Sequence, residues 1–165
     1  LITNDEGKTY SHFKGPEIAI KGATGVDWNW TEPTLAELSD HKIVMLIRVN
    51  HTGCLWRSES KDYGRTWTEA IPTDIPNPGN KPKLLNIPDG RIALIHTPNP
   101  TCGMSGRNPL AIWISSDDMQ TWSEKKVISD MPLVFCYPDG FYEDGHILFT
   151  IELNRHEILF VDYEL

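Results

Sequence analysis

Four residues of this chain have side chains and an order that could bind and transform an acidic ligand. Glu32 precedes an apolar run, Arg48 ends the next such run, and Arg107 and Tyr137 follow in the second half of the chain. Guanidinium groups bind carboxylates through two parallel hydrogen bonds and keep their charge at physiological pH. A neutral tyrosine is not repelled by such a carboxylate, and with a reference pKa of about 10 it needs a nearby base such as Glu32 to act as a nucleophile.

Each of these residues also has an ordinary structural interpretation. A single Glu or Arg at the end of a strand is usually a solvated surface charge, and a single Tyr among apolar neighbours usually belongs to the core. The set therefore points to a site only when its members are taken together, in this order. The elements that carry them must then bring their side chains to one place.

Those elements are organised around a repeated turn. Residues 60–67 read S-x-D-x-G-x-T-W, in which the Asp can accept backbone N–H groups and the Gly can take a positive φ. Residues 115–122 repeat the pattern with Met in place of Gly, and residues 3–10 repeat it with Tyr in place of Trp. The three aspartates, spaced by 57 and 55 residues, are Asp5, Asp62 and Asp117. A repeat of this length, with several short strands per period, is typical of propeller blades.

The pattern resembles the Asp-box (bacterial neuraminidase) repeat of sialidase-like six-bladed β-propellers, over nearly the whole chain. The resemblance implies an all-β fold of about three blades, each of four antiparallel strands, in a single domain over residues 1–165. It makes the Asp boxes structural turns without a catalytic role. It also implies a C-terminal half propeller, so the N-terminal half or a second copy of the chain is the expected partner for the uncovered ends.

The same resemblance implies roles for the candidate residues. Glu32 matches the glutamate that activates the nucleophile, Tyr137 matches the nucleophile, and Arg48 matches an arginine that holds the substrate carboxylate. Arg107, which opens the segment R-N-P-L, matches another arginine of that trio. Glu152 matches an acidic residue that braces an arginine. The implied activity is removal of a terminal acidic sugar, sialic acid, from a glycan with retention and without a metal or cofactor.

Two alternatives remain open at the level of sequence. Tyr137 is followed by Pro-Asp-Gly where sialidases typically have a Ser. The chain also resembles sialidase-fold polysaccharide lyases and uronic-acid hydrolases, in which a Tyr and a His can share acid and base work. The candidate histidines for that role are His51, His96 and His156. A propeller that binds glycans without cleaving them is the other alternative, because Asp boxes occur in both kinds of protein.

Apolar runs and turn signals predict the strands, and no segment has convincing helical periodicity. The expected strands are Glu17–Lys21, Pro33–Leu38, Ile43–Val49, Leu55–Glu59, Trp67–Ala70, Leu84–Ile87, Ile92–His96, Leu110–Ile114, Phe135–Phe141, Ile147–Leu153 and Glu157–Tyr163. The proline-rich segment 71–83 is expected to connect two blades. Trp67, Trp122 and Tyr10 are expected to pack at equivalent positions of their blades.

Composition excludes some partners. The net charge of −8 and the isoelectric point of about 5.1 disfavour nucleic acids and anionic membranes. No apolar run approaches the ~18 residues of a membrane-spanning helix. Three cysteines without C-x-x-C spacing predict buried thiols in preference to a disulfide or a metal site. The family resemblance favours a secreted or periplasmic location.

Overall fold

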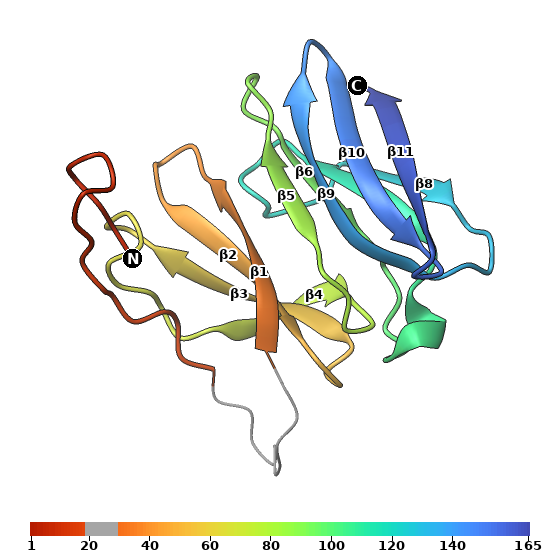
Figure 1. Ribbon diagram of the computed structural model, residues 1–165, viewed down its shortest axis with the longest axis horizontal. Helices are drawn as coiled ribbons and strands as arrows, with labels where there is room; N and C mark the ends of the chain where they lie inside the picture. The colour runs from red at the N-terminus through yellow and green to blue at the C-terminus, as the bar shows by residue number, and fades with distance from the viewer. Residues whose placement is uncertain (19–29) are drawn as a thin grey trace.

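The computed structural model describes residues 1–18 and 30–165, which form eleven strands and one short 3-10 helix (Figure 1). The all-β fold class predicted from the sequence is therefore confirmed. Of the predicted strand Glu17–Lys21, residues 19–21 lie outside the described residues, and Glu17 and Ile18 are not in a strand. Within the described part, no helix is long and apolar enough to cross a membrane.

The strands form three antiparallel sheets that are consecutive in sequence. The first sheet has the order β1-β2-β3-β4, with β1 at Trp30–Glu37, β2 at Ile43–Val49, β3 at Cys54–Ser60 and β4 at Ile71–Pro76. The second has the order β5-β6-β7-β8, with β5 at Lys83–Asn86, β6 at Ile92–His96, β7 at Leu110–Ser115 and β8 at Glu124–Ser129. The third has the order β11-β10-β9, with β9 at Phe135–Glu143, β10 at His146–Leu153 and β11 at Glu157–Glu164.

The first strands of the three sheets, β1, β5 and β9, lie next to one another, so the second sheet stands between the other two (Figure 1). The Thr34 hydroxyl of β1 accepts the backbone N–H of Leu84 in β5 at 2.9 Å. The Asn80 amide, just before β5, donates to the carbonyl of Phe135 in β9 at 2.8 Å. Both bonds join adjacent sheets through groups that would otherwise be buried without partners.

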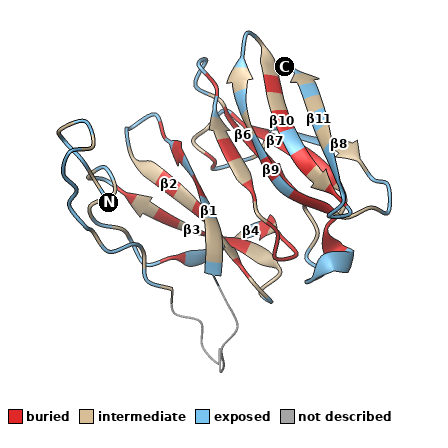
Figure 2. Cartoon of the chain, in the orientation of Figure 1, coloured by how far each residue is buried: buried red, intermediate tan, exposed pale blue. Residues whose placement is uncertain are grey.

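Apolar side chains fill the spaces between the sheets, and Figure 2 shows buried residues along the strands of all three. One cluster joins the first two sheets through residues such as Leu46 and Leu94. Another joins the second and third sheets and includes Ile112, Phe135 and Phe149. Because alternate residues of a strand point to opposite faces, each inner strand contributes every second side chain to these cores.

Two expectations about the strands were wrong. The segment Trp67–Ala70 is not a strand; the fourth strand, β4, begins at Ile71, inside the segment expected to be a connection. Its prolines, Pro72 and Pro76, are tolerated because β4 is an edge strand that pairs only with β3. The third sheet has three strands in place of four. The third sheet also contains no Asp box, because the three boxes lie before β1, between β3 and β4, and between β7 and β8.

The three Asp-box turns share one hydrogen-bond pattern. The Asp62 carboxylate accepts the backbone N–H of Thr66 at 2.8 Å and its hydroxyl at 2.6 Å. The boxes at Asp5 and Asp117 repeat both bonds, to the threonine four residues later, at 2.9 and 2.6 Å. These bonds lower the pKa of each aspartate to about 2. Both oxygens of each carboxylate thus accept hydrogen bonds within the turn, as expected of a structural element.

The aromatic residues of the boxes are not equivalent in packing, contrary to expectation. Trp122 packs against the core next to Trp113, with ring centroids 6.0 Å apart. Trp67 is half-buried and donates its indole N–H to the carbonyl of Gly64. Tyr10 is 59% exposed, and the described residues around the first box form one isolated bridge, between Ile2 and Ser11, and no strand.

The cysteines also differ from one another. All three thiols are free, but only Cys136 is buried, as expected. Cys54 is half-buried and Cys102 is exposed, so the prediction of three buried thiols was wrong for these two.

Candidate active site

Glu32 and Tyr137 occupy equivalent β-bulges on the first strands of two sheets. Both have the left-handed backbone conformation, with φ of 48° and 54°, and both precede a proline. In β1 the pairing with β2 shifts across Glu32 and Pro33, and in β9 the pairing with β10 shifts across Tyr137 and Pro138. Bulges re-aim side chains, and strained backbone of this kind is concentrated at functional sites.

Arg48, near the end of β2, is held by two side chains. Its Nη1 lies 2.6 Å from Oε2 of Glu32, and its Nε donates to Oδ1 of Asn50 at 2.9 Å. The Arg48 side chain is only 12% exposed. Glu32 and Asn50 therefore fix the plane of the guanidinium, leaving Nη2 without a protein partner in the described part of the chain. Such a fixed fork is suited to a planar anion.

Arg107 is buried and has no carboxylate partner among the described residues. It follows the 3-10 helix η1 (Met104–Gly106), and only 7% of its surface is exposed. Its Nη1 donates to Sγ of Cys136 at 3.0 Å and its Nη2 to the carbonyl of Gly79 at 3.0 Å, whereas its Nε has no partner. No carboxylate of the described residues forms an ion pair with it. Burying an unpaired charge is costly, so Arg107 is poised to accept an anion.

The two arginines line one cavity of about 170 Å³. The residues around it are Arg48, Asn50, His51, Pro78, Gly79, Gly103, Met104 and Arg107. They come from the end of β2 and its turn, from the β4–β5 connection and from the loop around η1. The sequence separates the arginines by a whole blade, but the lateral packing of the first two sheets brings them together. The volume is below the ~300 Å³ usual for a complete ligand pocket.

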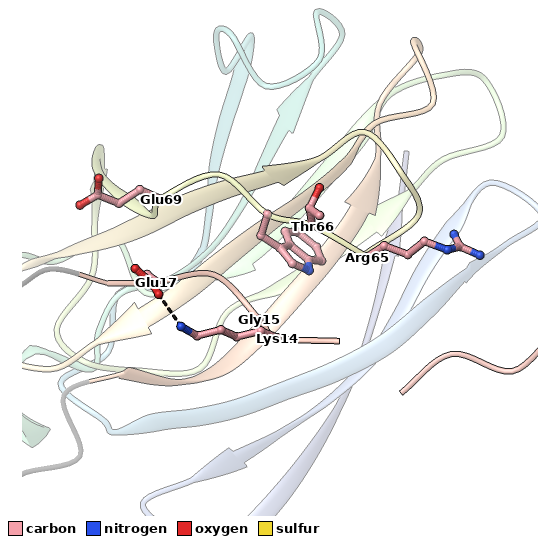
Figure 3. Close-up of a pocket in the computed structure, with 7 residues that line it drawn as sticks. Lys14, Gly15, Glu17, Arg65, Thr66 and Glu69 are labelled. Carbon is pink, nitrogen blue, oxygen red and sulfur yellow. Dashed lines mark hydrogen bonds and ion pairs between the residues drawn. The ribbon is translucent and has the colours of Figure 1, made fainter. Parts of the chain in front are cut away.

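A second cavity, of about 310 Å³, lies beside the Asp box of the first sheet (Figure 3). It is lined by Lys14, Gly15, Glu17, Arg65, Thr66, Trp67 and Glu69. None of the predicted site residues is among them, and Lys14 and Glu17 neutralise each other in an ion pair. The cavity between Arg48 and Arg107 is therefore the candidate site.

Glu32, Tyr137 and Glu152 are not among the residues that line this cavity. Tyr137 is 37% exposed and directly follows Cys136, the partner of Arg107. Glu152 on β10 lies opposite Cys136 on β9, the residue before the bulge at Tyr137. In the first sheet, Arg48 lies in the same way opposite Thr31, the residue before the bulge at Glu32. Glu152 and Arg48 therefore occupy equivalent positions in their sheets. Glu152 forms no ion pair with an arginine among the described residues, so its bracing role stays a prediction.

Sequence reasoning missed Asn50, Gly79 and Cys136, which hold the two arginines. One available signal was the X-Pro dipeptide, which lies at the bulges of β1 and β9, in residues 32–33 and 137–138, and just before β5, in residues 81–82. By contrast, nothing in the sequence distinguished Asn50 or Cys136 from ordinary strand-end residues.

The candidate histidines are in three different environments. His96 is fully buried edge-on against Trp113, and this burial lowers its pKa to about 3, so it is a neutral core residue. His156 is exposed in the turn between β10 and β11. His51 lines the cavity of the two arginines.

Solved structures with similar folds include two sialidases and an α-L-arabinofuranosidase. The Hadza microbial sialidase Hz136 has a TM-score of 0.70 at 21% identity, over 83% of this chain and 28% of its own. The Trypanosoma rangeli sialidase bound to the inhibitor DANA has a TM-score of 0.67 at 16% identity, over 98% and 26%. The α-L-arabinofuranosidase Arb93A from Fusarium graminearum has a TM-score of 0.63 at 18% identity, over 94% and 50%.

These likenesses confirm the fold predicted from the Asp boxes, that of blades from a sialidase-like β-propeller. The chain spans only about a quarter of the length of the two sialidases. Comparison with curated proteins gives no significant match. The family model described as BNR repeat-like domain matches residues 2–149. The chain therefore belongs to the BNR repeat-like domain family.

Proposed function

We propose that the full-length protein is a glycoside hydrolase that removes a terminal acidic sugar, sialic acid, from glycans. The observation that carries the proposal is the cavity lined by both Arg48 and Arg107, one a fixed fork and the other a buried guanidinium without a counter-ion. A carboxylate bound there would supply the negative charge that the described part of the chain does not offer to Arg107. It would gain two charge-assisted contacts, one from each of two arginines that are largely buried.

In the proposed mechanism, Oη of Tyr137 attacks the anomeric carbon while the bond to the leaving oxygen breaks. Glu32 accepts the phenolic proton, and its ion pair with Arg48 keeps its carboxylate oriented. Water then attacks the same carbon and releases Tyr137, so that two inversions give net retention. The acid that protonates the leaving oxygen and the third arginine are expected outside this chain. The rest of the propeller, or a second copy, would complete the site.

A second candidate is a propeller enzyme acting on uronic-acid glycans as a lyase or hydrolase. The observation that favours it is His51, which lines the arginine cavity and could serve as acid or base. A glycan-binding propeller without catalysis is the remaining alternative.

The test compares Tyr137→Phe with the unchanged full-length protein on sialosides and on uronic-acid glycans. Tyr137 is partly exposed, and the substitution removes only an oxygen, so the thermal midpoint should stay the same. Loss of the nucleophile should lower kcat on sialosides by more than about a hundredfold. Full activity of Tyr137→Phe would remove Tyr137 from the mechanism. Turnover of the uronic-acid glycans alone would favour the second candidate.

A further inference from the structure

His51 lines the cavity and is held there by its turn. It lies between β2 and β3 with a φ of 64°, a left-handed conformation that few non-glycine residues adopt. The next residue, Thr52, fixes the turn by donating its hydroxyl to the carbonyl of Val49 at 2.9 Å and by accepting the indole N–H of Trp56 at 3.3 Å. The carbonyl of Gly53 accepts the backbone N–H of Asn77 at 2.9 Å. The backbone position of His51 at the edge of the cavity is therefore set by the fold.

The imidazole has no structural task of its own. Its side chain is exposed and forms no hydrogen bond or ion pair with any residue in the described part of the chain. It nevertheless lines the same cavity as Arg48 and Arg107. An imidazole that lines the cavity and has no hydrogen-bond partner among the described residues can donate to or accept from a bound ligand.

The charges around His51 favour a negatively charged ligand. Arg48 comes from its own hairpin and Arg107 comes from the loop after η1, whereas Glu32 from β1 does not line the cavity and forms an ion pair with Arg48. The other elements that line the cavity contribute Pro78, Gly79, Gly103 and Met104, which carry no side-chain charge. An imidazole in this setting can donate a hydrogen bond to a bound anion, and it adds a third positive charge when it is protonated.

We propose that His51 is a specificity residue that contacts the acidic group of the ligand and makes its affinity depend on pH. This inference rests on the proposed function, because it assumes an acidic sugar between the two arginines. Protonated His51 makes a charge-assisted hydrogen bond to the carboxylate. Neutral His51 makes at best a weaker, uncharged one. Affinity should therefore be higher at pH 5 than at pH 8, because acid favours the charged form of an imidazole.

The experiment measures binding of N-acetylneuraminate and of glucuronate to the full-length protein by calorimetry between pH 5 and pH 8. Unchanged protein should bind one of the acids about tenfold more tightly at pH 5 than at pH 8, the difference expected for one charge-assisted hydrogen bond. His51→Gln keeps an N–H donor but cannot be charged, so its affinity should be the same across this range. His51→Asn is the matched second variant, since Asn tolerates a positive φ well. The methyl ester of the bound acid is the uncharged control and should show no pH dependence.

The outcomes separate the two proposals. If His51→Gln and His51→Asn keep the pH dependence of the unchanged protein, His51 does not contact the acid, while the proposed function stands. If neither acid binds the unchanged protein at pH 5, the proposed function fails, and the role of His51 fails with it. If His51→Gln lowers kcat on the cleaved glycan at an unchanged KM, His51 acts as an acid or base and not as a binding group.

Discussion

Replacing Arg107 by Met tests whether this arginine serves binding at the expense of stability. Methionine keeps an apolar stem of similar length but removes the charge. The change deletes two hydrogen bonds, to Cys136 and Gly79, each worth about 1.5–3 kcal/mol for a charged donor. It also removes a buried, unpaired cation, whose desolvation costs several kcal/mol. The two contributions nearly cancel, so the free energy of unfolding should change by less than about 2 kcal/mol.

Arg48→Met is the matched control, because Arg48 has a carboxylate partner. Its removal leaves Glu32 without a counter-ion in a site where that side chain is 25% exposed. Breaking a fully buried pair costs about 3–5 kcal/mol, and the partial exposure of Glu32 reduces this to about 2–3 kcal/mol. Arg48→Met should therefore destabilise the protein more than Arg107→Met does.

Urea denaturation of the full-length variants measures both changes, provided that the m-value stays constant. A bound acidic sugar should raise the unfolding midpoint of the unchanged protein, and it should fail to do so in either variant. A loss of more than about 3 kcal/mol in Arg107→Met would show that Arg107 behaves as an ion-paired structural arginine and not as a binding residue. The reasoning is also refuted if Arg107→Met still responds to the acidic sugar.

Two further predictions concern the scaffold. Phe149 is 1% exposed in the core between the second and third sheets. Phe149→Ala should therefore lower the free energy of unfolding, measured by urea denaturation, by about 3–5 kcal/mol. A loss below about 1 kcal/mol would mean that this core is loosely packed. The hydrogen bonds from Thr66 lower the pKa of Asp62 to about 2 from its ordinary value of 3.8. A carboxylate whose pKa is lower in the folded than in the unfolded protein stabilises the fold at pH values above the unfolded-state pKa. This stabilisation is lost as the pH falls from about 4 to about 2. Asp62→Asn should be less stable at pH 7 and show a weaker loss of stability over that interval, and an unchanged acid titration of stability would contradict this.

Local patterns in the sequence predicted much of the scaffold. The ranges expected for Ile43–Val49 and Ile92–His96 match β2 and β6 to the residue. Each is an apolar run bounded by turn residues, and such a pattern is decided by neighbours along the chain. The three Asp boxes form the same turn because the hydrogen bonds they share join residues four apart. The propeller fold followed from the period of these turns.

Packing between sheets decided what the sequence could not. The segment 71–76 has too many prolines for a central strand, and only its place at an open edge allows it to pair. Tyr10 has the type of a core residue, but among the described residues no sheet lies against it to bury it.

The candidate site was predicted in part from the sequence and decided in part by the packing of the sheets. The order of Glu32, Arg48, Arg107 and Tyr137 along the chain was enough to suggest a site. The packing of the sheets decided the rest. It places Arg48, Arg107 and His51 around one cavity, and it leaves Arg107 without a counter-ion among the described residues. The physical reason is that turns and strands depend on contacts between near neighbours in the chain, whereas the charge and shape of a cavity depend on residues that meet only when one blade packs against the next.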